Sequence, residues 1–181
     1  MNITVRQMNT DDLPAVAAIE AACYTDPWSE KGFADALVMP GSVLLAAECL
    51  TDRKEAFDSP AGKAPDADSK ERVPAGYIGM YTAADEGEII KVTVSHAFRR
   101  KGVGTALISA LIREAAKRGI RNIYLEVRIS NTAAAALYEK AGFAHCGIRK
   151  GFYDWPKEDA YVMCLKMNEE TNTVRMEDCD D

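Results

Sequence analysis

Residues 94–105 of this 181-residue chain read Val-Ser-His-Ala-Phe-Arg-Arg-Lys-Gly-Val-Gly-Thr. A predicted apolar strand over residues 88–94 leads into this segment, and a predicted amphipathic helix over residues 102–118 follows it. Glycine lets the backbone approach a ligand closely, and the first turn of a helix presents free N–H groups at the positive end of its dipole. Because three cations at residues 99–101 stand directly before that turn, the segment predicts an anion site, most naturally for a phosphate or a pyrophosphate.

Two common phosphate-binding motifs are absent from the chain. The P-loop pattern G-x-x-x-x-G-K-[ST] does not occur, and neither does the dinucleotide fingerprint G-x-G-x-x-G with its later acidic residue. The remaining alternative is a glycine-rich helix start whose basic residues are merely solvated. The position between a strand and an amphipathic helix favours a ligand site.

The rest of the chain predicts strands and helices around this segment. Period-two alternation and apolar runs predict strands, and apolar residues three or four apart predict helices. Strands are predicted over residues 3–8, 43–47, 75–82, 88–94, 122–127, 143–149 and 160–166, and helices from residues 10 and 29 and over residues 102–118 and 132–141. Strands on both sides of helices, with hairpins at both ends, predict an α/β or α+β mixed sheet.

Two segments differ in composition from this predicted body. Residues 51–74 contain three prolines, six acids and five bases, and Phe57 is their one large apolar residue. Such a segment buries too little surface to offset its ordering entropy, so it predicts a disordered insertion loop. Residues 168–181 hold six acids and one base, and so carry five of the chain's six net negative charges. They predict a flexible acidic tail after a single domain of residues 1–167.

Charge and cysteine content exclude several classes of protein. A net charge of −6 excludes a uniformly basic nucleic-acid-binding protein. The five cysteines form no C-x-x-C pair and only two histidines occur, so reduced structural thiols are expected; a catalytic cysteine and a zinc site are the alternatives. No signal peptide and no apolar run of about 20 residues is found, which predicts a cytoplasmic protein without a membrane or nucleic-acid partner.

A family resemblance rests on several motifs. The pattern R-x-x-G-x-G of residues 99–104, in this context, resembles the acetyl-CoA-binding motif of the Gcn5-related N-acetyltransferases. The resemblance continues in Leu-Glu-Val-Arg (125–128), Ser-Asn (130–131) and Ala-Leu-Tyr-Glu-Lys-Ala-Gly-Phe (136–143), and it spans about residues 2–167. It implies a mixed, mostly antiparallel sheet that is splayed at its centre and has helices on both faces.

The resemblance also implies a set of ligand contacts. Acetyl-CoA would be the co-substrate, with its pantetheine arm along the strand that ends at Val94, its pyrophosphate in the cationic loop, and a further contact at the start of the next helix. The cofactor residues implied in this way are Val92, Thr93, Val94, Arg99, Arg100, Lys101, Gly102, Val103, Gly104, Thr105 and Asn131.

Two further stretches, Pro-Trp-Ser-Glu (27–30) and Ile-Arg-Lys-Gly-Phe-Tyr (148–153), resemble the bacterial branch that acetylates the N-terminal alanine of a small-subunit ribosomal protein. The resemblance implies Glu126 as the base and Tyr138 as the acid in direct acetyl transfer. A base is needed because a protein α-amine, with a pKa near ~7.7–8, is mostly protonated at neutral pH. A backbone N–H near Val94 would stabilise the oxyanion.

Alternatives to these roles stay open at this point. Glu88 is a rival base, Glu126 could instead pair with Arg128 or a neighbouring lysine, and Tyr138 could be core packing. The acceptor could be another amine, such as a small molecule, polyamine, antibiotic or lysine, or the chain could bind acyl-CoA without catalysis. A monomer or weak dimer is expected.

Five other residues attract attention for their chemistry. His96, in the turn of the cofactor motif, is expected to be solvated, and His145, on a late strand, to be structural. Trp28 is either a core anchor or a wall of the substrate groove, and Tyr153 either lines that groove or packs locally. Lys91 departs from the neutral polar residue that relatives often carry near the acceptor site.

Overall fold

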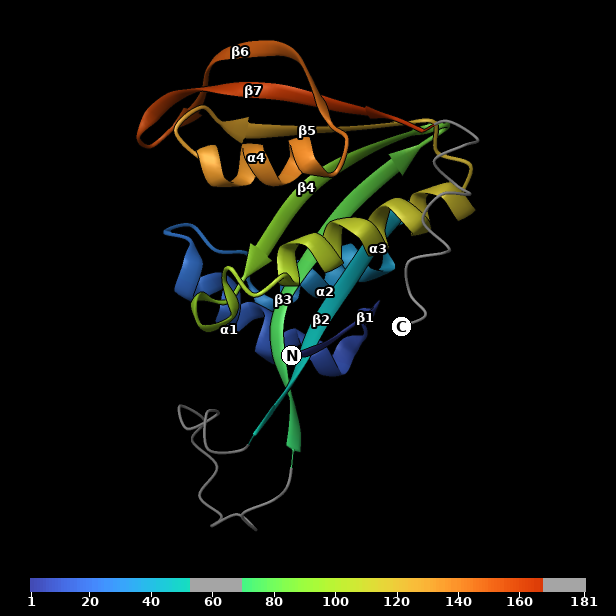
Figure 1. Cartoon of the computed structure of the whole chain (residues 1–181), viewed down its shortest axis with the longest axis vertical. Coiled ribbons are helices and arrows are strands. Elements are labelled where there is room, and N and C mark those ends of the chain that lie inside the picture. The colour runs from blue at the N-terminus through green and yellow to red at the C-terminus, as the bar shows by residue number, and fades with distance from the viewer. Residues whose placement is uncertain (53–69, 168–181) are drawn as a thin grey trace.

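The computed structural model describes residues 1–52 and 70–167. A seven-stranded sheet forms the body, in the order β1-β2-β3-β4-β5-β7-β6 (Figure 1). The strands are β1 (Asn2–Gln7), β2 (Ser42–Asp52), β3 (Lys70–Ala83), β4 (Glu86–Val94), β5 (Asn122–Arg128), β6 (Ala144–Asp154) and β7 (Lys157–Lys166). Neighbours pair antiparallel except β4 and β5, which are parallel.

Helices cover both faces of the sheet. They are α1 (Leu13–Cys23), α2 (Glu30–Val38), α3 (Val103–Lys117) and α4 (Thr132–Lys140), with short 3₁₀ turns η1 (Thr10–Asp12) and η2 (His96–Phe98). Side chains of β2 alternate between two apolar clusters, since Leu45 packs with α3 and Leu44 packs with α1 and α2. Helices α1 and α2 therefore lie on one face and α3 and α4 on the other, which confirms the predicted fold class.

Local signals explain the boundaries of the helices. In α3 the apolar residues stand four apart and are completely or almost completely buried, as the sequence predicts: Val103, Leu107, Leu111 and Ala115. Gly119 takes a φ of +72° just after the helix, a conformation that favours glycine. The carboxamide oxygen of Asn131 accepts a hydrogen bond from the N–H of Ala134 at 3.2 Å and so caps α4.

The parallel pair β4–β5 is short, and this fact positions the site. Residues 86–89 of β4 pair with residues 122–125 of β5, and the recorded pairing ends there. The register between β3 and β4 shifts at the same level, so that Ile90 is an extra residue in β4. Beyond this bulge β4 and β5 diverge (Figure 1). The end of β4, residues 92–94, therefore has a ladder partner on its β3 side and none on its β5 side among the described strands.

The predicted insertion loop is corrected at both of its ends. β2 runs to Asp52 and β3 begins at Lys70, and Thr51 pairs with Glu71 in the ladder between them. Backbone pairing and the packing of Val73 against the core outweigh the polar composition of these residues. Residues 53–69 of the predicted loop, and the predicted acidic tail, lie outside the described residues. Within the described part of the chain, no helix has the length and apolar character needed to cross a bilayer.

Candidate active site

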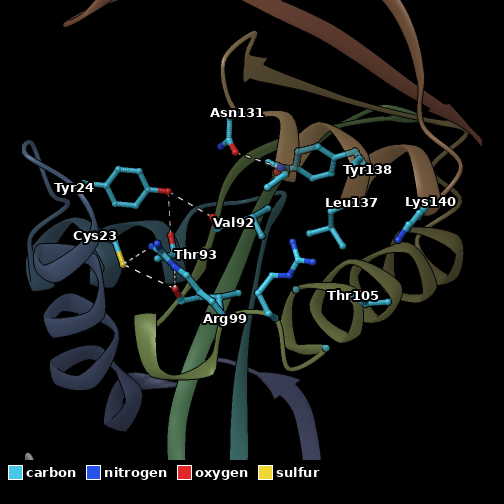
Figure 2. Close-up of a pocket in the computed structure, with 17 residues that line it drawn as sticks. Cys23, Tyr24, Val92, Thr93, Arg99, Thr105, Asn131, Leu137, Tyr138 and Lys140 are labelled. Carbon is cyan, nitrogen blue, oxygen red and sulfur yellow. Dashed lines mark hydrogen bonds between the residues drawn. The ribbon is translucent and has the colours of Figure 1, made fainter.

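A cavity of about 630 Å³ lies where β4 and β5 diverge (Figure 2). Most of the cofactor residues implied by the resemblance line it. Those that do are Val92, Thr93, Val94, Arg99, Arg100, Gly102, Gly104, Thr105 and Asn131. The splay thus brings together residues from β4, the start of α3 and the start of α4.

Two of the implied cofactor residues do not line this cavity. The side chain of Val103 is 1% exposed and belongs to the core beneath α3. The ammonium of Lys101 lies 5.7 Å from the centroid of the Phe98 ring. Successive residues of a helical turn point in different directions, so a continuous sequence motif cannot face one ligand with every side chain.

The wall along β4 presents polar backbone groups. The hydroxyl of Tyr24 donates to the carbonyl oxygen of Val92 at 3.5 Å and accepts from the hydroxyl of Thr93 at 3.3 Å. Arg99 Nε donates to the carbonyl oxygen of Val94 at 3.2 Å, and Arg99 also reaches Cys23 Sγ at 3.6 Å. Tyr24 and Cys23 stand at the end of α1 and were not predicted, because no local pattern connects them to the cofactor motif.

The opposite part of the cavity suits an anion. Gly102 caps α3 with a φ of +87°, and a Cβ on Gly104 would lie 3.0 Å from Leu137 of α4. Glycine therefore permits both the turn and the close approach of the two helices. Arg100 precedes this helix start and Lys140 of α4 joins it in lining the cavity. Amides at a helix N-terminus with flanking cations fit the diphosphate of acetyl-CoA.

Tyr138 of α4 reaches the cavity from its β5 side (Figure 2). Its ring is 8% exposed and meets the ring of Phe143 nearly edge-on, with 5.8 Å between centroids. Burial, together with the nearby Tyr24 and Tyr153, raises the pKa of its hydroxyl above the usual value. The hydroxyl stays protonated at neutral pH. Tyr138 therefore packs in the core, one of the alternatives considered from the sequence, and also lines the cavity.

Glu126 lies outside the residues that line the cavity, and its ion partner is neither Arg128 nor a lysine, the two partners considered from the sequence. Arg149 of β6 donates to Glu126 Oε1 at 2.7 Å. Arg128 instead binds Glu158 at 3.0 Å and donates to backbone carbonyls of the β6–β7 turn. Tyr153 stacks under Arg128, with 4.0 Å from the guanidinium carbon to the ring centroid, and its hydroxyl donates to the Glu126 carbonyl at 3.4 Å.

The rival base Glu88 occupies a different place. Its backbone pairs with Tyr124 in the closed, ladder-bonded part of β4 and β5. Its side chain is exposed, and it is not among the cavity-lining residues. Glu88 thus lies where β4 and β5 are still paired, whereas Glu126 lies just beyond the last recorded β4–β5 pair.

Lys91 neutralises a buried carboxylate that the sequence did not reveal. Its ammonium forms an ion pair with the fully buried Glu20 of α1, whose carboxylate also accepts from the Tyr77 hydroxyl and, at 3.2 Å, from the N–H of Trp28. The same ammonium lies 4.6 Å from the centroid of the Tyr24 ring and 5.1 Å from that of Trp28. Burial and the hydrogen bond to Glu20 raise the pKa of Tyr77. In the sequence, the burial of Glu20 was indicated only by its position four residues after Val16, which places both residues on the same side of the helix.

The two histidines and Trp28 were the other candidates from the sequence. His96 is exposed, as expected. His145 Nε2 lies 3.0 Å from Glu139 on the surface. Trp28 is partly buried: its ring packs 5.4 Å from that of Phe33, and it also lines a second cavity together with Tyr81. In the described ranges, no group of three or more histidine, cysteine or acidic residues could hold a metal ion.

A sheet that splays at its parallel pair, with a glycine-rich cationic helix start in the opening, is the architecture of an acyl-CoA N-acyltransferase. Comparison with known families agrees, because residues 13–143 match the acetyltransferase (GNAT) family. The chain belongs to this family and is an acetyl-CoA-dependent N-acetyltransferase.

Relatives over nearly the whole length define the similarity further. The chain is 33% identical to the ribosomal protein bS18-alanine N-acetyltransferase of Escherichia coli K12, over 91% of this chain and 98% of the relative. It is 30% identical to a Bacillus subtilis protein named as a putative enzyme of the same kind, over 91% and 96%. The crystal structure of the Escherichia coli enzyme matches with a TM-score of 0.71 and 32% identity, covering 93% of this chain and 97% of that one.

Proposed function

We propose that this enzyme acetylates the N-terminal α-amine of a protein, specifically the N-terminal alanine of a small-subunit ribosomal protein, in the cytoplasm. The observation that carries the proposal is the cavity at the splay, which has cations at one part and the protonated Tyr138 at another. The names of the full-length relatives in Escherichia coli and Bacillus subtilis support this acceptor.

Different residues of the cavity bind different parts of acetyl-CoA. The free edge of β4 at residues 92–94 binds the amide-rich pantetheine arm as an added strand would. Arg100, Lys140 and the amides at the start of α3 bind the diphosphate. Acetyl-CoA, when bound, supplies the acetyl group as an activated thioester. This arrangement directs the thioester toward Tyr138.

Three groups of the chain then serve the transfer. Glu126 accepts the proton of the α-ammonium, directly or through a water molecule, so that the neutral amine can attack. A backbone N–H near Val94 donates to the carbonyl oxygen of the acetyl group. Tyr138 would donate its proton to the departing sulfur, and the second proton that the attacking nitrogen loses on becoming an amide would replace it on the Tyr138 oxygen. Proton transfer by a positioned side chain contributes roughly 100- to 10,000-fold to the rate.

The test is acetylation of a short synthetic peptide that begins with alanine and follows a ribosomal sequence, detected by mass spectrometry after incubation with acetyl-CoA. The same peptide with a blocked N-terminus is the matched control. We expect one added acetyl group on the free peptide and none on the blocked one, and a Glu126→Gln variant should lose at least 100-fold in kcat. Acetylation of a small amine or a lysine with no product from the free peptide would refute the proposed acceptor.

A further inference from the structure

The ion pair between Glu126 and Arg149 spans three strands. Arg149 of β6 is opposite Ala160 of β7, which in turn is opposite Arg128 of β5. Directly paired residues point to the same face of a sheet, and so do residues two apart on a strand. Arg149 and Glu126 therefore share a face. Ala160 is fully buried beneath this crossing, and its small side chain lets the arginine lie across β7.

This face is the one opposite α4. The residues of β5 that alternate with Glu126, namely Leu125 and Val127, are buried in the core with α3 and α4. The helices on the face of Glu126, α1 and α2, pack on β2, β3 and β4. In the described part of the chain, the Arg149 side of the pair is thus exposed on this half of the sheet, whereas the Glu126 side chain is 15% exposed, and Figure 1 shows α1 and α2 on the other half of the sheet.

Arg149 retains unused donors. A guanidinium carries five N–H donors. Among the described residues, its recorded hydrogen bond is the one to Glu126, and its side chain is 56% exposed. Its guanidinium carbon lies 4.5 Å from the centroid of the Phe152 ring, a stacking contact that holds the plane and leaves the N–H edges free.

The Glu126–Arg149 pair also lies near the part of the site where we propose that acetyl transfer takes place. Tyr153 connects the two regions, since its hydroxyl donates to the Glu126 carbonyl at 3.4 Å. The pKa of Tyr153 is raised mainly by burial, with contributions from Glu126 and Tyr24, and Tyr153 contributes to the raised pKa of Tyr138. Glu126 itself follows Leu125, the last residue of β5 with a recorded β4 partner, so the Glu126–Arg149 pair lies on the part of β5 that faces the opening between the two strands.

A protein N-terminus is complementary to such a pair. It carries an ammonium and a peptide carbonyl on either side of one carbon, whereas a lysine side chain or a polyamine carries no carbonyl beside its amine. We propose that Arg149 is a specificity-determining residue, which donates to the first carbonyl of the acceptor while Glu126 takes the ammonium. This inference rests on the proposed function and adds how a protein N-terminus is selected over other amines.

The experiment removes either partner of the proposed hydrogen bond. Arg149→Met removes the guanidinium, and the substrate 2-aminopropane replaces alanine N-methylamide to remove the carbonyl. Arg149→Lys keeps the charge, and Lys150→Met is the control for loss of a neighbouring exposed cation. Values of kcat/KM for acetyl transfer are measured for each enzyme with each amine and with the alanine-starting peptide.

Any effect of Arg149→Met on Glu126 as the base is common to all amines, so we expect the ratio of kcat/KM for the two carbonyl-bearing acceptors to that for 2-aminopropane to fall about 10- to 100-fold, mainly through KM. Arg149→Lys should recover part of the loss, and Lys150→Met should lose less than about twofold. Equal losses of Arg149→Met on all amines, or no loss on the peptide, would overturn the inference alone. Turnover by the unmodified enzyme of 2-aminopropane but not of the peptide would overturn both the inference and the proposed acceptor.

Discussion

Replacing Lys91 with methionine tests the buried ion pair that supports one wall of the cavity. Glu20 is fully buried, and the variant would leave its carboxylate with the Tyr77 hydroxyl and the N–H of Trp28 but no cation. Removing one partner of a buried ion pair costs about 3–5 kcal/mol, because the other charge remains desolvated and uncompensated. We therefore expect Lys91→Met to lower the free energy of unfolding by about 3–5 kcal/mol.

The double variant Glu20→Gln with Lys91→Met separates charge from shape. Glutamine keeps an oxygen that can accept from Tyr77 and Trp28, and no charge remains buried. The double variant should then lie within about 1–2 kcal/mol of the unmodified protein, far less than the sum of the single losses. Because Lys91 also contacts the ring of Tyr24, which lines the cavity, the double variant should still show a raised KM for acetyl-CoA.

Urea unfolding followed by circular dichroism measures these changes, through the midpoint and the slope m. The KM for acetyl-CoA comes from steady-state assays of the same preparations. A loss below about 1 kcal/mol in Lys91→Met, or strictly additive losses in the double variant, would refute the reasoning that Lys91 compensates a buried charge. An unchanged KM for acetyl-CoA in both variants would refute the connection to the cavity wall.

Three other outcomes are expected. Tyr138→Phe should lower kcat about 100-fold with little change in KM for acetyl-CoA, and an unchanged kcat in steady-state assays would remove it as the acid. Burial raises the pKa of Tyr138, so the folded protein favours the protonated hydroxyl. The stability that this provides is complete below a pH of about 10 and is lost as the pH rises above that value. Urea unfolding midpoints should therefore fall above pH of about 10, and less steeply in Tyr138→Phe. Arg100→Ala and Lys140→Ala should each weaken CoA binding about three- to tenfold in calorimetry, a modest loss because both side chains are exposed, while Lys117→Ala at the far end of α3 should not.

Features that depend on neighbouring residues could be predicted well. The apolar spacing of α3, its glycine start and the cations before it all act within a few residues, and the structure places Arg99, Arg100, Gly102 and Gly104 at the cavity. The predicted lengths of the elements were less accurate. β2 and β3 extend into the predicted insertion loop, and β6 continues to Asp154, because a strand is stabilised by its partner rather than by its own composition.

The contacts among the acceptor-side residues could not be predicted, because these residues meet only through strand pairing. Glu126 was identified by resemblance, but its partner Arg149 is two strands away in the sheet and depends on the register of β7 between them. Lys140 and Tyr24 reach the cavity from α4 and from the end of α1. No local pattern in the sequence states which helix end will lie against which strand.

Sequence alone was enough to identify the family and to predict an anion site at the start of a helix. Those properties arise from backbone amides, glycines and cations that are adjacent in the chain. The tertiary structure alone decided which carboxylate is buried against Lys91 and which arginine meets Glu126. The physical reason is that electrostatic partners are set by distance in the folded protein, and the bulge at Ile90 and the pairing of β5, β7 and β6 determine those distances.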